Sequence, residues 1–257
     1  MLAMSSLHLL PDRTGVAAEN MALDFLLLQR YPAPKEARFR HYEWRRPAFT
    51  FGFSQKIKFV HANLPSEILA QGEQPDAASF DLCRRPTGGG IVDHRNDWTF
   101  TLVLPRGHAL YDERAAQSYR IVHECLTKAL VDLGQPAEVK TKCEPCSPEG
   151  AVPSEALAQE GICFQRAELY DVVNTATGLK IAGAAQKRTK HGLLFQGSIE
   201  KSAVGTIDWE DFSARFTSAL AHALRVEAKE TPWPDLNEDE VSGLIEQYSS
   251  LEWVEYR

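Results

Sequence analysis

The sequence predicts an α+β fold, in which a mixed or antiparallel sheet packs against helices. Strand-like and helix-like segments are grouped along the chain rather than alternating as they would in a doubly wound sheet. Residues 169–200 contain three strand-like runs separated by short turns, which is typical of an antiparallel meander. Residues 114–133 and 209–224 instead repeat apolar side chains with helical spacing.

The first half of the chain contains one strong helix signal and several strand signals. In order, we expect a helix at 17–29, strands at 37–44 and 48–53, a helix at 64–71, a short strand at 80–83 and a strand at 98–104. In the second of these strands one face is aromatic, and the other face carries Ala48, Thr50 and Gly52. A face of small residues indicates either a strand that lines a pocket or one that packs closely on a helix.

The second half begins with a long helix at 114–133, which ends at Gly134, a typical helix-terminating glycine. The remaining elements are strands at 169–174, 179–188 and 193–200 and helices at 209–224 and 237–248, the last with Asn237 as its N-cap. Residues 142–161 carry three prolines, which predicts an irregular insert. We expect residues 1–257 to form a single domain, with residues 226–257 as a short helical tail.

The composition excludes several classes of protein. Of the 257 residues, 44% are hydrophobic and 25% are charged, which is ordinary for a soluble globular chain. The net charge of −7 gives no electrostatic support for nucleic-acid binding. No apolar run reaches the roughly 18 residues that a membrane span needs, and the N-terminus lacks the basic flank of a signal peptide. Five cysteines, an odd number, suggest free thiols in a reducing cytoplasm.

The most informative stretch is the glycine stretch, residues 84–90, with the sequence Arg-Arg-Pro-Thr-Gly-Gly-Gly. Three consecutive glycines cost conformational entropy, so they indicate a left-handed backbone or a backbone that a ligand approaches closely. Their spacing matches neither a dinucleotide-binding fingerprint nor a P-loop. A surface turn is the alternative, but the neighbouring charged side chains suit an anion or a carbonyl. We therefore predict ligand-binding residues at Arg84, Arg85, Thr87, Gly88, Gly89, Gly90 and His94.

Two further residues carry candidate chemistry. Lys180 begins a strand of small and apolar residues, so it either faces solvent or is buried with its ammonium in a site. Cys163 is either a buried structural thiol or an activated nucleophile, because only the thiolate attacks. Cys143 and Cys146 could be redox-active or half a zinc site, but no second pair accompanies them. We therefore predict that they are two incidental thiols, and we predict no metal site.

Four blocks of sequence resemble the superfamily of lipoate–protein ligases, octanoyltransferases and biotin–protein ligases. Within it, the chain is similar to the cysteine-dependent octanoyltransferases of the lipoate-ligase-like branch. The blocks are residues 20–24 (Asn-Met-Ala-Leu-Asp), residues 47–55 (Pro-Ala-Phe-Thr-Phe-Gly-Phe-Ser-Gln), the glycine stretch with His94, and residues 180–188 (Lys-Ile-Ala-Gly-Ala-Ala-Gln-Lys-Arg) followed by Gly197-Ser198-Ile199. The resemblance implies a class II synthetase-like catalytic domain with an apolar tunnel for an acyl chain. It adds Gly183, Ala184 and Gly197 to the expected ligand-binding residues.

The resemblance also implies a reaction. In the cysteine-dependent transferases the nucleophile lies in a Cys-Phe-x-x-Pro-Ser-x-Tyr segment, and residues 163–170 keep its Cys, Phe and Tyr but replace Pro-Ser with Ala167-Glu168. The implied function is transfer of an octanoyl or lipoyl group from an acyl-carrier-protein thioester, through Cys163, to a lysine of a lipoyl-carrier domain. Lys180 would contact the acyl carbonyl. The family often has His-Gly-Ser where this chain has Gln196-Gly197-Ser198.

Such a transferase would need no cofactor, because a thioester is already activated. Its partners would be octanoyl-acyl carrier protein and the lipoyl-carrier domain of a glycine cleavage H protein or a 2-oxoacid dehydrogenase E2, and we expect a cytoplasmic monomer. One alternative is an ATP-dependent lipoate–protein ligase, which would use ATP and Mg²⁺ to adenylate the acid before transfer. Another is a degenerate protein that binds a lipoyl or acyl group without turnover, which the departures at Gln196 and at Ala167-Glu168 keep open.

Overall fold

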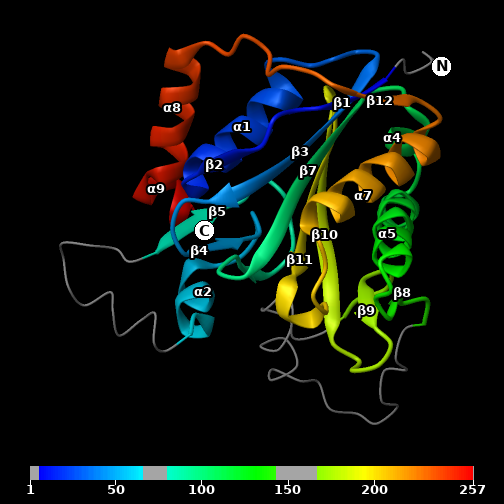
Figure 1. Cartoon of the computed structure of the whole chain (residues 1–257). Coiled ribbons are helices and arrows are strands. Elements are labelled where there is room, and N and C mark those ends of the chain that lie inside the picture. Colours follow the sequence, from blue (N-terminus) through cyan, green and yellow to red (C-terminus); the bar gives the residue numbers. More distant parts are fainter. Residues whose placement is uncertain (1–5, 66–79, 143–166, 257) are drawn as a thin grey trace.

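The computed structural model describes residues 6–65, 80–142 and 167–256. It shows a large sheet with helices on both faces, and a smaller sheet packs against one of these two faces (Figure 1). The predicted α+β fold is therefore confirmed. Cys163, Cys143 and Cys146 lie outside the described residues, as do most of the predicted insert and residues 66–71 of the predicted helix.

Nine of the described strands form the large sheet, which is mixed. They are Ser6–Leu9 (β1), Arg13–Gly15 (β2), Glu36–Trp44 (β3), Asp97–Pro105 (β7), Ala137–Val139 (β8), Val172–Asn174 (β9), Lys180–Thr189 (β10), Gly192–Glu200 (β11) and Glu227–Glu230 (β12). Their order is β12-β1-β3-β7-β11-β10-β9-β8, with β2 beside β3. From β3 to β8 neighbouring strands are antiparallel, and β9-β10-β11 is the predicted meander. The pairs made by β12, β1 and β2 are parallel.

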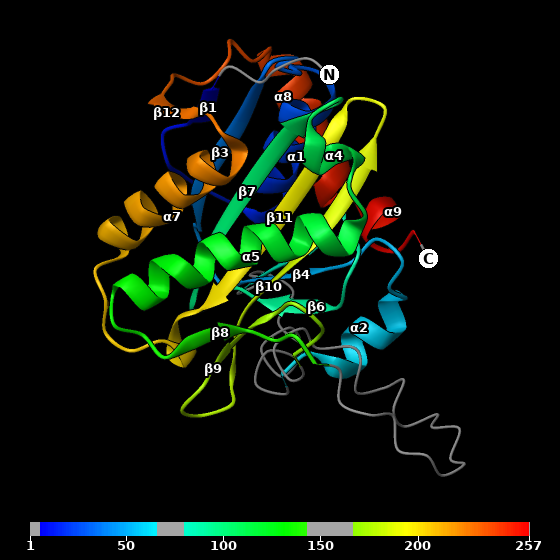
Figure 2. The same ribbon diagram turned by 90° about the vertical axis from the view of Figure 1, so that its right-hand side faces the viewer.

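Two helices, α5 (Ala115–Asp132) and α7 (Trp209–Leu224), cover one face of the large sheet (Figure 2). Between them and the sheet lies the largest core, which is rich in aromatic rings. The edge of the Phe216 ring on α7 packs on Phe100 of β7, with 5.0 Å between the ring centroids. Gly134 follows α5 in a left-handed conformation, with φ of 77°, as expected for a glycine that ends a helix.

The other face carries α1 (Ala17–Gln29), α8 (Glu238–Ser249), the short α9 (Leu251–Val254) and the small sheet (Figure 1). The small sheet has β4 (Ala48–Phe51) between β5 (Asp81–Arg84) and β6 (Ile91–Asp93). Asn237 caps α8 as predicted, because its side chain accepts the backbone N–H of Glu240 at 3.0 Å. Among the described residues, no helix combines the length and the apolar character that crossing a membrane requires.

Several predicted boundaries are wrong. The helix expected at 64–71 does not begin at Leu64: α2 (Ile57–Asn63) precedes it, and Leu64 is extended. Pro65 follows Leu64, and a proline disfavours helical conformation in the residue before it. The expected strand 169–174 shortens to β9, because Tyr170 takes a left-handed conformation with φ of 70°. β12 lies within the predicted helical tail, and α4 (Ala109–Asp112) and the 3₁₀ helix η1 (Lys201–Ala203) are further short elements.

The glycine stretch reaches β4 through a position that has no side chain. A Cβ atom on Gly52, directly after β4, would lie 2.1 Å from the carbonyl oxygen of Gly89. That clash involves backbone atoms on both sides, so no rotamer change can relieve it. The face of β4 that carries small residues both packs on a helix and lines a pocket, as the two interpretations of the sequence proposed. Ala48 packs with α1, and Thr50 faces a pocket.

We expect Gly52→Ala to destabilise the protein by about 2 kcal/mol, because the glycine stretch must move away from the added methyl group. The measurement is the free energy of unfolding in urea. Gly243→Ala on α8 is the matched control, since a Cβ there meets nothing within 4 Å and alanine favours a helix by about 0.5–1 kcal/mol. Equal stability of the two variants would contradict the close approach.

Candidate active site

A half-open pocket with an empty volume of about 400 Å³ lies between the two sheets. The small sheet and the glycine stretch form one wall, and β10 and β11 form the other. The residues that line it are Thr50, Arg85, Gly89, Val92, His94, Gly183, Ala184, Ala185, Gln196, Gly197 and Ser198. The structure thus brings together six of the predicted ligand-binding residues, namely Arg85, Gly89, His94, Gly183, Ala184 and Gly197. Their roles as ligand contacts stay predictions.

Arg85 holds the glycine stretch against β4. Its guanidinium donates to Thr50 Oγ1 at 2.8 Å and to the carbonyl oxygens of Gly88 and Gly90 at 2.9 Å each. Between these two carbonyls, Gly89 has φ of 89°, a conformation that side chains disfavour. The stretch then continues into β6 rather than into a helix, so no helix N-terminus faces the pocket from this loop.

Arg84 and Thr87 are not among the residues that line the pocket. The Arg84 guanidinium ties the small sheet to α9 by donating to the carbonyl oxygens of Phe53, Gln55, Trp253 and Val254. Thr87 donates to Gln196 Oε1 at 2.7 Å, and the Gln196 amide donates to Asp24 Oδ2 at 2.6 Å. Asp24 in turn forms a fully buried ion pair with Arg40 at 2.8 Å. Gln196 thus links the pocket to the polar interior beneath α1.

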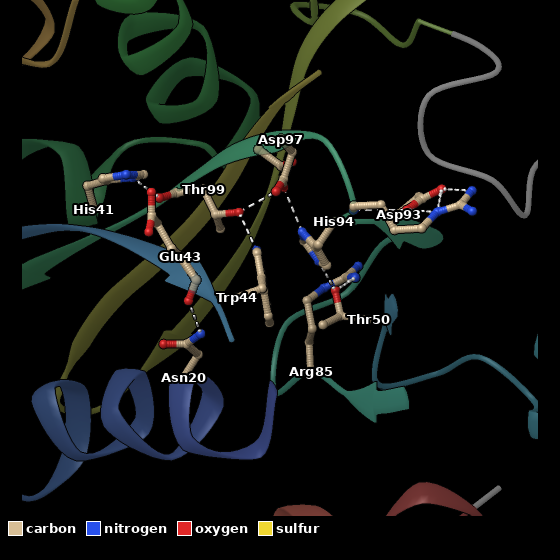
Figure 3. Close-up of polar contacts among 12 residues, drawn as sticks. Asn20, His41, Glu43, Trp44, Thr50, Arg85, Asp93, His94, Asp97 and Thr99 are labelled. Atoms are coloured by element: carbon tan, nitrogen blue, oxygen red, sulfur yellow. Dashed lines mark hydrogen bonds and ion pairs between the residues drawn. The ribbon is translucent and has the colours of Figure 1, made fainter. Parts of the chain in front are cut away.

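His94 forms the polar part of the pocket (Figure 3). Its ring stacks on Trp44, with 4.0 Å between centroids. The contacts form one continuous chain: Arg85 donates to Thr50 Oγ1, Thr50 Oγ1 lies 2.7 Å from His94 Nε2, and His94 Nδ1 donates to Asp97 Oδ2 at 2.6 Å. This chain fixes the plane of the imidazole and leaves its face toward Trp44.

Asp97 anchors this chain as a carboxylate. Burial acts to raise the pKa of Asp97, but the charge of His94 and hydrogen bonds from His94, Ser198 and Thr99 outweigh it and hold the pKa below its usual value. Both hydroxyl groups donate to the same oxygen as His94 does. The carboxylate therefore joins β7 and β11 to the loop that carries the imidazole.

Lys180 is buried at the start of β10, where its ammonium forms an ion pair with Asp171 at 2.8 Å. The two side chains are only 4% and 1% exposed, so the solvent-facing interpretation of Lys180 is wrong. A Cβ on Gly183 would lie 2.7 Å from Lys180 Nζ. Because Gly183 lines the pocket, the ammonium lies directly beside the pocket wall.

Asp171 is held from two further directions. The hydroxyl of Tyr119, on α5, donates to Asp171 Oδ1, and the backbone N–H of Glu168 donates to Oδ2 at 2.6 Å. The Tyr119 hydroxyl also accepts the N–H of Ala184 at 3.0 Å. Helix α5, the turn before β9 and strand β10 therefore converge on one carboxylate, which positions the Lys180 ammonium.

With the fold and the pocket described, comparison with known proteins identifies the family. Residues 16–203 match the family described as the lipoyl protein ligase A/B catalytic domain. The chain belongs to this family. Relatives include a protein named octanoyltransferase LipM from Macrococcus caseolyticus, which is 27% identical over 93% of this chain and 94% of that protein. A protein of the same name from Oceanobacillus iheyensis is 34% identical over 72% of this chain and 60% of that protein.

Solved structures show the same fold. The crystal structure of a lipoate-protein ligase A bound with ATP superposes with a TM-score of 0.72, at 16% identity over 98% of both chains. A bi-partite lipoate protein ligase from Thermoplasma acidophilum has a TM-score of 0.71, at 18% identity over 99% of this chain and 98% of that chain. At such identities the likeness concerns the fold alone, and it confirms the predicted lipoate-ligase-like architecture.

Two cysteines, Cys83 and Cys125, lie among the described residues, and neither supplies a thiolate at neutral pH. Burial raises the pKa of Cys83 to about 12, and burial also raises the pKa of Cys125 to about 12. Both therefore act as packing residues. That Cys163 is the nucleophile therefore stays a prediction, and it rests on the sequence.

Thr50, Tyr119 and Asp171 are among the residues at the site that were not predicted as functional. Tyr119 reads as part of the apolar stripe of a helix, and Thr50 as one small residue on a strand. Asp171 follows Tyr170 at the start of an otherwise apolar strand, and a lone carboxylate in such a run is a signal that could have identified it. The described residues contain no group of three or more His, Cys, Asp or Glu side chains that could hold a metal ion.

His123 lies behind the Lys180 site in a fully buried position. It contacts the carbonyl oxygen of Tyr170 through Nδ1 at 2.6 Å, while Nε2 is buried and has no hydrogen-bond partner in the described part of the chain. Burial lowers the pKa of His123 to about 4. Between about pH 4 and pH 6.5, this imidazole is therefore neutral in the folded protein and protonated in the unfolded chain.

This difference predicts acid sensitivity. Between the unfolded pKa of about 6.5 and the folded value of about 4, the unfolded state binds more protons, so stability falls as the pH falls. We expect urea unfolding to show that the wild type loses about 2 kcal/mol more than His123→Gln between pH 7 and pH 5. His222→Gln, at an exposed position on α7, should behave like the wild type. Equal losses in the wild type and His123→Gln would refute the assignment.

Proposed function

We propose that this protein is an octanoyltransferase that moves an octanoyl group from an acyl-carrier-protein thioester, through Cys163, to a lysine of a lipoyl-carrier domain. Two relatives named octanoyltransferase LipM align over 93% and 96% of this chain, which supports an acyltransferase activity. The structural observation that carries the proposal is the buried Lys180 ammonium beside the pocket wall. A fixed cation at that place suits a carbonyl oxygen that becomes negative during acyl transfer.

The proposed reaction has two steps. In the first, the Cys163 thiolate attacks the carbonyl carbon of the donor thioester, the carbonyl oxygen becomes an oxyanion, and the donor thiolate leaves and takes up a proton. In the second, the neutral amine of the acceptor lysine attacks the acyl-enzyme, the Cys163 thiolate leaves, and the amine proton is lost to solvent. Each step passes through an oxyanion, and the Lys180 ammonium stabilises it in both.

No part of this reaction requires ATP, because the donor thioester is already activated. We propose that the acceptor is a lipoyl domain of a glycine cleavage H protein or a 2-oxoacid dehydrogenase E2. We also propose that residues 1–257 act as one catalytic domain. In support, the C-terminal helices α8 and α9 share a core with α1, and two backbone carbonyls of α9 accept hydrogen bonds from Arg84 in the glycine stretch.

We expect Cys163→Ala to abolish the covalent intermediate. Intact-protein mass spectrometry after incubation with octanoyl-carrier protein should show one hydroxylamine-labile octanoyl adduct on the wild type and none on the variant. Cys143→Ala and Cys146→Ala are matched controls and should retain the adduct. Full transferase activity in Cys163→Ala would exclude this mechanism.

We expect Asp171→Asn to slow acylation about 100-fold in single-turnover kinetics, because the Lys180 ammonium loses its fixed counter-charge. Breaking a buried ion pair also destabilises, by about 3–5 kcal/mol. The double variant Asp171→Asn/Lys180→Met separates the two effects, since it leaves no unpaired charge and should recover stability without recovering activity. Wild-type rates in either variant would show that the pair has no part in the reaction.

A further inference from the structure

Three lysines lie near one end of the pocket. Lys56 and Lys58 stand at the start of α2, and Lys187 stands on β10. No described carboxylate lies within ion-pair distance of any of them, including Glu252 and Glu255 on the nearby α9. Several basic side chains elsewhere on the surface do pair with acids, as in Arg46–Asp81, Arg95–Asp93, Arg120–Glu124, Lys128–Asp132 and Arg215–Asp211.

The two segments that carry these lysines border the same opening. The loop after β4 lies against the glycine stretch, because Gln55 donates to the carbonyl of Gly89 at 3.4 Å. Lys187 lies two residues beyond Ala185, which lines the pocket, and its ammonium sits over the Phe53 ring at 5.2 Å. Figure 2 shows α2 and α9 on the same side of the molecule, next to the small sheet.

Both segments lack acidic residues altogether, although the chain as a whole carries a net charge of −7. Residues 52–65 and residues 180–199 contain lysine, arginine and histidine but neither aspartate nor glutamate. Unpaired charges of one sign at the mouth of a pocket produce a local field that attracts the opposite charge. Among the described residues, the segments that border the opening are therefore positive, whereas the chain as a whole is acidic.

An aromatic cluster lies next to these lysines. The ring of Phe53 contacts Trp253 and Tyr256, with centroid distances of 6.0 and 5.6 Å. The side chain of Tyr256 is 56% exposed, which is unusual for a large aromatic ring, and solubility does not require a ring at this position. Aromatic side chains beside basic ones are enriched where proteins bind other proteins.

We propose that Lys56, Lys58 and Lys187, together with the Phe53–Tyr256 cluster, form the docking surface for an acidic carrier protein that delivers the acyl group. This proposal rests on the proposed function. The donor carries its acyl thioester on an arm that is joined to the protein through a phosphate, so the negative charge of the arm and of the carrier matches the lysines. The acceptor instead presents a lysine ammonium, which the same lysines repel.

The test compares two donors with the charge-reversal variant Lys56→Glu/Lys58→Glu. Both positions are exposed and outside the pocket lining, and acidic residues in the first turn favour a helix, so α2 should stay folded. We expect the rate constant for Cys163 acylation by octanoyl-carrier protein to fall at least about 10-fold at low ionic strength and to become less dependent on salt. Acylation by octanoyl-pantetheine, which has neither protein nor phosphate, should not change. Lys187→Gln should give a smaller loss with the same donor selectivity.

Lys229→Glu on β12 is the control, since it reverses one lysine charge, half the change of the double variant, at the far edge of the large sheet and should leave both rates unchanged. Equal losses with both donors, or no loss with the carrier donor, would overturn the docking surface. So would a loss confined to transfer to the lipoyl domain. Fluorescence-detected binding of the octanoyl-carrier protein separates the two proposals. If the wild type binds the carrier but is never acylated, and Lys56→Glu/Lys58→Glu weakens binding, the proposed function fails while the docking surface stands.

Discussion

The buried ion pair between Lys180 and Asp171 is the interaction on which the site depends. A protein interior tolerates two almost fully buried opposite charges only when each is paired and hydrogen-bonded. Asp171 meets this requirement with Tyr119 from α5 and with the backbone before β9, so one carboxylate fixes α5 and this turn relative to β10. The same contacts hold the ammonium against Gly183, at the pocket wall. The constraint that makes the pair stable is thus also what places a positive charge where an acyl carbonyl would lie.

The pocket itself depends on missing side chains. Gly52 lets the glycine stretch approach β4, and a Cβ on Gly197 of β11 would lie 2.3 Å from the Phe100 ring. Opposite these glycines, Arg85, Thr50, His94 and Asp97 form a continuous hydrogen-bonded chain that gives one part of the pocket a fixed polar surface. A fixed polar surface, a wall of small residues and a buried ammonium suit a chain with a carbonyl at one end. The Gln196 that replaces a histidine common in the family belongs to the polar network under this surface.

Much of the fold could be predicted from sequence, because α1, α5, α7 and α8 and the β9-β10-β11 meander have strong periodicity and connect locally. The parallel strands β1, β2 and β12 could not, since they are three or four residues long and pair with distant segments. Within the site, Lys180 and the glycine stretch carry recognisable motifs. Asp171 and Tyr119 acquire their roles only when α5 packs beside β10, a contact that no local pattern encodes. Arg84 shows the reverse case, since its motif position suggests a ligand contact whereas its guanidinium meets backbone carbonyls on α9.

The central claim is that this site transfers an acyl group that arrives already activated, with Lys180 as the fixed cation. The most direct measurement is octanoylation of a lipoyl domain by the wild-type protein, followed by intact mass, with octanoyl-carrier protein as donor and with apyrase present to remove ATP. We expect complete octanoylation without ATP and no lipoate-dependent exchange of pyrophosphate into ATP. This claim would be contradicted if the lipoyl domain were modified only when ATP, Mg²⁺ and the free acid were supplied.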